Sequence, residues 1–488
     1  MIGLLALVAC KDQWEEHNET VRQELGKNLF ETIKEKPELS RFAGYLEQTG
    51  FDKVLAYSKT YTVWAPNNNA LQTLDASVTA DTAKLRLFIA NCIAPQTYFT
   101  SSARQALKIK TLSGKHIIFS ATAFEEATVV AADNYVKNGV LHVVDKPILP
   151  KPNAAEFVKS YSSGLSKQFA FLSRLEHIET DTSKGVKLYT DPATGRSVFR
   201  DGTTFPVQRN YYYQRVADLT REDSLCTYLI LNDAAFDQER NKLQTYFKRE
   251  DPLQTDSLVQ WNVVKDLTIS GVKTAEQLAA GVMSLSGVRI QVSPGAVIET
   301  RKLSNGIAYV INKLDYTVLE NKIPVLVIEA EMPDSVRTPS AIVRKIKRDN
   351  MGVLFTDVLA SGITSTVDPM YHLRFRSVAH SVKYRVIWRA VNDVLTAPIS
   401  MKVDFSNRSG YPKAADPQLI TTGYKQVAPL VNPTTGVINP AAYNEVVLGE
   451  YTPERYGTLY AFLVAATGAS SASPTALSLD YIKLVPVN

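Results

Sequence analysis

The sequence predicts an α+β domain that occurs twice in tandem, followed by an all-β sandwich with a jelly-roll-like strand pattern. The repeat is predicted because one set of short strings occurs twice in the same order, which indicates two copies of one domain. The sandwich is predicted because many short runs of alternating apolar residues follow residue 325. A chain of 488 residues suits about three domains, and 45% hydrophobic residues can fill their cores.

The repeated strings share a strand-like run, a Leu-Ser-Gly turn and an Asn-Gly pair that opens a second strand. They are Tyr61–Asn67, Leu112–Gly114 and Asn138–Lys146 in the first repeat, and Leu229–Phe236, Leu285–Gly287 and Asn305–Lys313 in the second.

These strings resemble the two signature boxes of the fasciclin family, which read like Thr-Val-Phe-Ala-Pro-Thr-Asn and Asn-Gly-Val-Ile-His-Val-Ile-Asp-Lys. The first repeat matches both boxes nearly residue for residue, and the second has Tyr309 where the family has histidine. The resemblance covers roughly residues 25–318 and implies a twisted β-wedge flanked by helices. We expect structural roles for the signature residues, which are Thr62, Ala65, Pro66, Asn67, Asn138, Gly139, His142, Asp145, Asn232, Asn305, Gly306 and Tyr309.

The first repeat, residues 25–150, is expected to place helices before strands. Apolar spacing predicts helices over 28–36, from residue 40 onward and over 84–92. Residues 61–64 predict a strand, and the alternation from 112 to 145 predicts a run of strands. Asn138-Gly139 predicts a two-residue hairpin turn, because glycine tolerates a positive φ.

The second repeat, residues 153–320, carries an insertion over residues 185–216 that looks like an added hairpin. It ends in Tyr211, Tyr212 and Tyr213, and three consecutive aromatic residues on a strand cannot all face one way. At least one is therefore expected to be accessible. One interpretation is a docking surface for a partner or a sugar. The other, which we favour, is an insert that packs on its own domain.

The predicted sandwich spans residues 325–488. Its strings at 325–331 and 477–487 look like the first and last strands of jelly-roll carbohydrate-binding modules, which pair in one sheet. A long loop, 406–443, contains Tyr411, Tyr424 and Tyr443, and tyrosines on such loops stack on sugar rings or anchor protein partners.

Arg374 and Arg376 alternate with apolar residues, and basic residues alternate in the same way over 383–389. The pattern predicts one sheet with a buried apolar face and a cationic face. That cationic face is either a recognition surface or, as we favour, a solvated face that resists edge aggregation.

The N-terminus predicts a lipid anchor. Residues 2–9 form an apolar run that stops at Cys10, and residues 7–10 resemble a bacterial lipobox whose cysteine is acylated. We therefore expect residues 1–10 to be a lipoprotein signal segment. Basic residues are absent ahead of the run, and the sequence leaves open whether the start codon lies upstream of Met1. The acidic residues after Cys10 resemble the surface-export signal of Bacteroidota lipoproteins, and residues 11–24 suit a polar tether. The alternative is a short buried helix with an incidental cysteine.

Several function classes are not expected. A net charge of +5 without a basic aromatic stripe argues against nucleic-acid binding. Cys92 and Cys226 are too few for a disulfide framework and suit buried positions. We find no catalytic, metal-ligating or cofactor-binding motif. We interpret His142 as a hydrogen-bonded structural residue rather than a catalytic one, because the second repeat replaces it with Tyr309.

We therefore expect a non-catalytic, lipid-anchored protein on the outer-membrane surface, because the fasciclin resemblance implies adhesion and interaction. By analogy with Bacteroidota surface lipoproteins, its expected partners are a starch-utilisation-type TonB-dependent transporter and the lipoprotein that lids it. The alternatives are a free-standing adhesin or glycan-binding protein, and a glycan-degrading enzyme built on the sandwich, since paired carboxylates leave no linear motif there.

Overall fold

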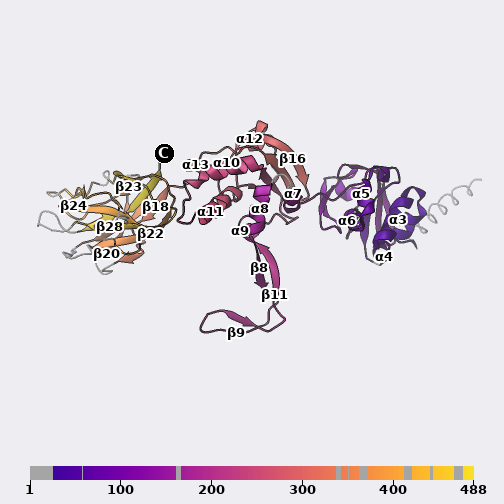
Figure 1. Ribbon diagram of the computed structural model, residues 1–488, viewed down its shortest axis with the longest axis horizontal. Coiled ribbons are helices and arrows are strands. Elements are labelled where there is room, and N and C mark those ends of the chain that lie inside the picture. The colour runs from indigo at the N-terminus through magenta and orange to yellow at the C-terminus, as the bar shows by residue number, and fades with distance from the viewer. Residues whose placement is uncertain are drawn as a thin grey trace, which may run out of the picture. The chain divides into compact units, whose positions relative to one another are not determined.

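The computed structural model describes residues 26–57, 59–160, 166–336, 342–349, 351–361, 371–411, 420–432, 434–439, 443–466 and 476–488 (Figure 1). They form two compact units, one of residues up to 230 with 268–274 and 297–310, the other of 231–267, 275–296 and 311–488. This division passes through the second repeat, so the three predicted domain boundaries stay a prediction. The predicted fold class is confirmed: helices and strands alternate through both repeats, and the described residues after 325 form strands and no helix.

The helices of the first repeat begin and end at residues suited to helix termini. Asn28 and Glu31 form a capping box, in which each side chain accepts a hydrogen bond from the other residue's backbone N–H. Gly50 ends α3 with a left-handed φ of 77°. The helical elements are α2 (Leu29–Glu35), η1 (Pro37–Leu39), α3 (Ser40–Thr49), α4 (Phe51–Ala56), η2 (Ala70–Thr73), α5 (Ala76–Ala80), α6 (Thr82–Asn91) and η3 (Thr100–Ala103).

A seven-stranded sheet runs through the first repeat. Its strand order is β2 (Ile93–Ala94), β1 (Tyr61–Pro66), β7 (Gly139–Val144), β6 (Ala127–Val136), β5 (Ala123–Phe124), β4 (His116–Phe119) and β3 (Leu107–Lys110). β1 and β7 are parallel neighbours, and every residue of both strands is buried. Strands buried on both faces read as continuous apolar runs, which explains the apolar character of the two signature strings.

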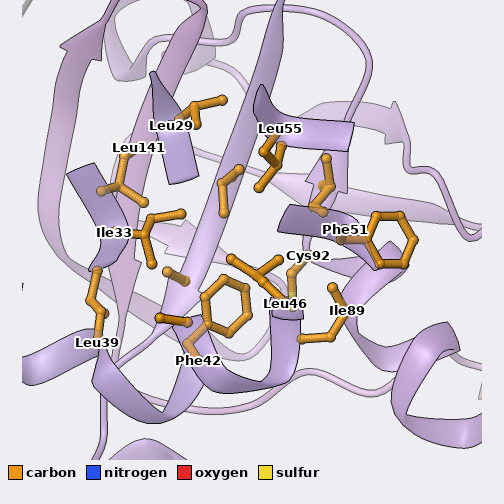
Figure 2. Close-up of a cluster of buried hydrophobic side chains, with 14 of the residues drawn as sticks. Leu29, Ile33, Leu39, Phe42, Leu46, Phe51, Leu55, Ile89, Cys92 and Leu141 are labelled. Carbon is orange, nitrogen blue, oxygen red and sulfur yellow. The ribbon is translucent and has the colours of Figure 1, made fainter. Parts of the chain in front are cut away.

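The sheet has apolar packing on both of its faces. Val63 of β1 packs in a cluster with residues of α2, α3 and α4, and Figure 2 shows Phe42 and Leu46 of that cluster beside Ile89. The next residue, Trp64, packs in a second cluster with side chains of β3, β4 and β5. Successive side chains of a strand point to opposite faces, so β1 connects the two clusters.

The hairpin between β6 and β7 is present, but its turn lies one residue earlier than predicted. Val136 pairs with Gly139, so Lys137 and Asn138 make the turn and Gly139 opens β7. Gly139 has a φ of 155°, and a Cβ on it would lie 1.9 Å from the carbonyl oxygen of Tyr61. Glycine is therefore required because β1 lies directly against it.

The second repeat contributes elements to both compact units. In the first unit lie α7 (Ala154–Ser160), α8 (Ser166–Arg174), α9 (Tyr211–Arg215) and a sheet in the order β13 (Thr268–Ser270), β12 (Cys226–Leu231), β17 (Gly306–Ile311) and β16 (Val297–Leu303). In the second lie α10 (Asp233–Gln244), α11 (Pro252–Val264), α12 (Ala275–Ala280), β14 (Val282–Met283), β15 (Arg289–Ile290), η5 (Pro294–Ala296) and α13 (Val318–Asn321).

The predicted insertion forms a projecting β-ribbon that we call the arm, residues 176–210. Its inner half pairs β8 (Glu176–Asp181) with β11 (Phe205–Asn210), and its outer half pairs β9 (Lys187–Thr190) with β10 (Ser197–Phe199). The arm therefore begins before the predicted insertion at 185. The expectation that Tyr211, Tyr212 and Tyr213 lie on a strand is wrong, because Asn210 caps a helix there, α9.

The segment after residue 325 consists of antiparallel sheets. The first holds β18 (Leu326–Glu329), β30 (Tyr481–Pro486), β23 (Tyr384–Arg389) and β27 (Val446–Tyr451) in that order. The second holds β19 (Ser335–Val336), β22 (His372–Ala379), β28 (Gly457–Ala465), β24 (Ile399–Ser406) and β25 (Ile420–Thr421), with β26 (Lys425–Val427) also on β24. The third holds β20 (Ile342–Arg348), β21 (Leu354–Ala360) and β29 (Leu477–Leu479).

The expected pairing of the first and last strands of the sandwich is confirmed by β18 and β30, in which Ile328 lies opposite Ile482. None of the described helices is long and apolar enough to span a bilayer.

Candidate functional site

The asparagine that precedes the second signature strand ties distant segments of the first repeat together. Asn138 Oδ1 accepts a hydrogen bond from Leu29 N at 2.8 Å, and its Nδ2 donates to the carbonyl oxygens of Leu55 at 2.7 Å and Tyr57 at 2.9 Å. The buried amide thus holds the start of α2 and the end of α4 on the hairpin. A buried polar group with every partner satisfied fixes one arrangement of its neighbours.

Asn305 makes the same three bonds in the second repeat. Its Oδ1 accepts from Ala154 N at 2.9 Å, and its Nδ2 donates to the carbonyl oxygens of Leu219 at 2.9 Å and Arg221 at 3.2 Å. Gly306, which follows it, also lacks room for a Cβ, because that atom would lie 1.8 Å from Cys226 O. The two repeats therefore share one polar frame as well as one sequence pattern.

A threonine on the first signature strand bonds the same loop in each repeat. Thr62 Oγ1 donates to Gln96 O at 2.7 Å and accepts from Tyr98 N at 2.8 Å. In the second repeat, Thr227 Oγ1 donates to Gly271 O at 2.7 Å and accepts from Lys273 N at 2.8 Å. Tyr98 and Lys273 are therefore equivalent positions.

His142 and Tyr309 bond those equivalent positions. His142 is fully buried, and its Nδ1 accepts from Asp133 N at 3.2 Å, so Nε2 carries the proton that it shares with Tyr98 O at 2.9 Å. Burial lowers the pKa of His142 and keeps the ring neutral. Tyr309 donates its hydroxyl to Lys273 O at 2.8 Å. A tyrosine can replace the histidine because the position requires only one hydrogen-bond donor, to the carbonyl oxygen of Tyr98 or Lys273.

The remaining signature residues also serve the backbone. Asn67 and Asn232 each accept a bond at 2.8 Å, from Ala70 N and Ala235 N respectively. Asp145 accepts from Thr128 N at 2.7 Å. Ala65 and Pro66 lie in the buried strand β1.

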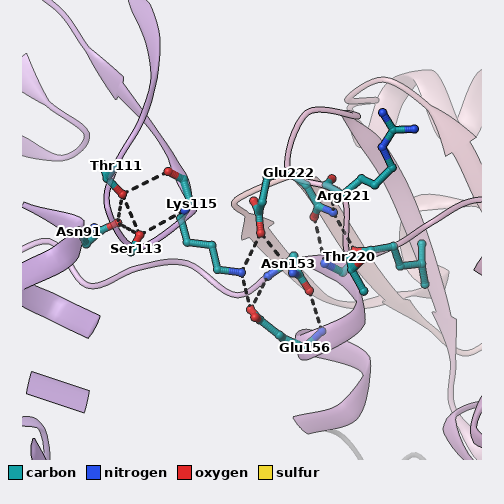
Figure 3. Close-up of polar contacts among 12 residues, drawn as sticks. Asn91, Thr111, Ser113, Lys115, Asn153, Glu156, Thr220, Arg221 and Glu222 are labelled. Carbon is teal, nitrogen blue, oxygen red and sulfur yellow. Dashed lines mark hydrogen bonds and ion pairs between the residues drawn. The ribbon is translucent and has the colours of Figure 1, made fainter. Parts of the chain in front are cut away.

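An ion-pair cluster that the sequence did not predict joins the two repeats within the first compact unit (Figure 3). Lys115, only 8% exposed, places Nζ 2.7 Å from Glu156 Oε2 and 2.8 Å from Glu222 Oε1. Asn153 donates to Glu222 Oε1 at 3.1 Å and caps α7 through Glu156. Lys115 follows the Leu-Ser-Gly string, whose Ser113 hydroxyl bonds Asn91 at 3.1 Å. The Leu-Ser-Gly turn of the first repeat thus places the Lys115 ammonium against two carboxylates of the second repeat.

The three consecutive tyrosines have different environments. Tyr212 is buried and its hydroxyl lies 2.6 Å from Thr268 Oγ1. Tyr211, 40% exposed, stacks on His177 with ring centroids 3.8 Å apart, and the guanidinium of Arg215 lies 4.8 Å above its ring. Burial raises the pKa of Tyr213 to about 12. The three tyrosines therefore do not form a common binding surface, and Tyr211 and Tyr212 make contacts at the base of the arm.

The loop tyrosines of the sandwich separate into two groups. Tyr411 donates its hydroxyl to Asp404 Oδ2 at 2.7 Å, and the Lys402 ammonium lies 2.8 Å from the same oxygen and 5.3 Å from the Tyr424 ring. Tyr443 lies elsewhere and donates to Asp393 Oδ2 at 3.2 Å. The predicted set of three is therefore not one surface.

The Lys402–Asp404 ion pair, which contacts both Tyr411 and Tyr424, was not predicted from the sequence. Lys402 and Asp404 alternate along β24 with the buried Met401 and Val403, so their spacing carried the signal. β25 and β26 interrupt the predicted loop and pair with β24, while residues 412–419, 433 and 440–442 lie outside the described part.

The predicted cationic sheet face is wrong, because its two basic strands, β22 and β23, lie in different sheets. Within β22 the alternation holds, since Leu373 and Phe375 are buried while Arg376 is exposed. Arg374 is engaged rather than solvated. It lies 2.6 Å from Asp334 and donates to Ser409 O at 2.5 Å.

The described residues contain no group of three or more His, Cys, Asp or Glu side chains placed to hold a metal ion. Cys92 and Cys226 are both buried and unbridged, and burial raises the pKa of each thiol. Cys10, the signal segment and the tether lie outside the described residues.

Comparison with solved structures finds likenesses for both parts of the chain. A FAS1 domain pair from the insect cell adhesion molecule fasciclin I is 15% identical, with 58% of this chain and 97% of that chain covered and a TM-score of 0.23. A family 35 carbohydrate-binding module from Clostridium thermocellum is 14% identical, covering 34% and 99%, with a TM-score of 0.21. The CBM22-1 xylan-binding domain of Paenibacillus barcinonensis Xyn10C is 16% identical, covering 34% and 97%, with a TM-score of 0.22.

No curated protein matches the sequence. Residues 37–150 match the family model of the fasciclin domain. The match contains Asn67, Asn138 and His142, whose bonds build the polar frame described above. Residues 37–150 of this chain are therefore a fasciclin domain.

Proposed function

We propose that the protein is a non-catalytic binding and scaffold protein of the outer-membrane surface. The observation that carries the proposal is the use of the signature side chains. Asn138, His142 and their counterparts Asn305 and Tyr309 all bond backbone groups of their own repeat, so they serve the frame rather than a reaction. The match to the fasciclin domain supports an adhesion or glycan-binding role.

The surface location rests on the N-terminal sequence. Acylation of Cys10 would attach more than one acyl chain, which is enough for stable membrane retention. The residues that follow would act as a tether for the repeats. In this arrangement the protein is an accessory of a starch-utilisation-type TonB-dependent transporter and its lidding lipoprotein, and the repeats dock on that complex.

Glycan binding is the second candidate, and Tyr424 is the residue that favours it. Tyr424 is 41% exposed, and the Lys402 ammonium lies 5.3 Å from its ring centroid, in an ion pair with the buried Asp404. The ring is therefore held in place while part of it stays accessible for stacking on a sugar ring. Tyr411 is less suited to stacking, because its ring already stacks on His372 with centroids 4.9 Å apart.

The test compares retention with turnover. The purified full chain is incubated with polysaccharides, and bound chain and soluble products are both measured. Binding without products supports the proposal, and release of oligosaccharides overturns it. Tyr424→Ala should weaken retention at least tenfold if the sandwich binds glycan. The matched control is Tyr57→Ala, which removes an exposed tyrosine of the first repeat and should leave retention unchanged.

A further inference from the structure

A hairpin of the sandwich ends in a turn that its own side chains hold in place. Every residue of β20 pairs with a residue of β21. In the turn between the two strands, Asp349 Oδ1 accepts hydrogen bonds from Met351 N at 3.0 Å and Val353 N at 2.9 Å. Asp349 Oδ2 also lies 3.8 Å from the guanidinium of Arg389, which belongs to β23. The turn therefore has a fixed conformation before any partner binds.

This hairpin leaves large apolar side chains in water around its turn. Met351 is 82% exposed, Ile346 76%, Leu354 56% and Val353 55%. Exposed apolar side chains that gather in one place mark a contact with another protein or with a membrane. We call residues 346–349 and 351–354 the hairpin tip.

Basic side chains flank the apolar ones on the same side of the hairpin. Arg344, Ile346 and Arg348 alternate along β20, so their side chains point to one face. Leu354 lies opposite Arg348 in the strand pair and therefore shares that face. Lys345 is exposed on the other face. The apolar tip thus carries cations on both sides of the hairpin.

The positive charge is not cancelled by the two acidic residues of the hairpin. Asp349 is bonded within the turn, and Asp357 is buried with Lys347 Nζ 2.5 Å from its carboxylate. Arg344 and Arg348 donate instead to backbone carbonyl oxygens, at 2.9 Å and 3.0 Å respectively. Both arginines are exposed, so the tip presents a net positive charge to an anionic partner.

The position of the hairpin argues against a β-strand as that partner. β20 is the edge strand of its sheet among the described strands, and its exposed Arg344, Lys345 and Arg348 oppose the addition of another strand. The apolar side chains lie around a turn rather than on a flat face. A turn of this kind enters the soft headgroup region of a bilayer, whereas a folded protein would need a matching hollow.

We propose that the hairpin tip is a membrane contact, which inserts Ile346, Met351 and Leu354 into a lipid bilayer with anionic headgroups. Arg344 and Arg348 then lie at the lipid phosphates, with their alkyl stems along the apolar region. Interfacial binding of this type strengthens with apolar area and with anionic lipid. The contact goes beyond the proposed function and does not require an acyl chain on the protein.

Vesicle co-sedimentation tests the apolar part of the contact, with a full chain that carries Cys10→Ser. Vesicles of phosphatidylcholine and phosphatidylglycerol in equal parts should retain the chain better than phosphatidylcholine alone, and salt should weaken retention. Ile346→Asp with Leu354→Asp should lower retention at least roughly tenfold. The matched control, Ile178→Asp with Phe205→Asp, changes two similarly exposed strand residues of the arm and should leave retention unchanged.

The charged part of the contact has its own variant. Arg344→Gln with Arg348→Gln should lower retention on the mixed vesicles at least roughly tenfold, because each basic residue near an anionic surface strengthens binding about fivefold. Retention on phosphatidylcholine alone should not change. Equal losses on the two kinds of vesicle would contradict a contact between these arginines and lipid phosphates.

A fluorescent probe locates the contact. Met351→Cys in the same background offers an exposed thiol, whereas Cys92 and Cys226 are buried. An environment-sensitive probe at position 351 should shift to the blue on mixed vesicles, and the same probe on Ser197→Cys, exposed on the arm, should not. A probe at 351 that does not shift on vesicles that retain the chain overturns the proposal. So do equal losses of retention for the tip and arm pairs. A parent chain that binds neither kind of vesicle also overturns it and favours an acidic protein as the partner.

Discussion

Replacing Gly139 by alanine tests the frame of the first repeat most sharply. The added Cβ would lie 1.9 Å from the Tyr61 carbonyl oxygen and 2.9 Å from Leu29 Cδ1. Tyr61 is held in place, because it pairs with Gly139 across β1 and β7 and its N–H bonds Asn138 O at 3.1 Å. The clash is therefore relieved only if the two central strands separate locally.

The cost has two parts. A non-glycine residue at a φ of 155° costs about 1–3 kcal/mol. Separating the strands loses one or two backbone hydrogen bonds, at about 0.5–1.5 kcal/mol each. We expect the free energy of unfolding of the first repeat to fall by about 1.5–6 kcal/mol in Gly139→Ala, and the middle of this range exceeds the usual effect of one substitution.

Urea unfolding of the full chain, followed by hydrogen exchange of peptides from β1 and β7, measures this loss within the first repeat. Gly114→Ala is the matched control, because Gly114 has a φ of 82° but no atom within 4 Å of the added Cβ. It should cost about 1 kcal/mol. Equal losses for the two variants would refute the argument that close strand approach requires glycine at 139.

Two further predictions follow from the same structure, and a third follows from the N-terminal sequence. Removing the ring donor with His142→Phe or Tyr309→Phe leaves a buried carbonyl unbonded and should cost about 1–3 kcal/mol of stability; unchanged urea midpoints would contradict the structural role. Burial lowers the pKa of His380 from 6.5 to about 4, so the unfolded state binds the proton first and stability should fall as the pH drops from 6.5 to 4. His380→Phe should remove that part of the pH dependence. Equal slopes of unfolding free energy against pH for the parent and the variant would disprove it. Cys10→Ser should move the protein from the membrane fraction to the soluble fraction, whereas firm retention would rule out the lipid anchor.

The sequence was sufficient for the fold class, because local patterns encode it. The Asn-Gly strings marked both central strand pairs, and the alternation after residue 325 marked the sandwich. The predictions that were wrong concern positions whose hydrogen-bond partners are distant in the sequence. The hairpin turn moved by one residue because the Asn138 side chain bonds Leu29, Leu55 and Tyr57 and must turn inward.

The candidate surfaces were less predictable for the same reason. Asn210 caps a helix and overrides the strand preference of the three tyrosines that follow it. Lys115 meets Glu222 across 107 positions, and Arg374 meets Asp334 across 40, so no local spacing reveals either pair. Alternation predicted which side chains of β22 face outward, but not which strands are neighbours in a sheet.

The most direct test of the central claim is affinity isolation of the intact protein from its own membranes in mild detergent, with stoichiometry measured by quantitative mass spectrometry. The proposed accessory role predicts a TonB-dependent barrel and its lidding lipoprotein in near-equal amounts with this chain. The chain recovered without them under conditions that keep the barrel and its lid together would contradict it.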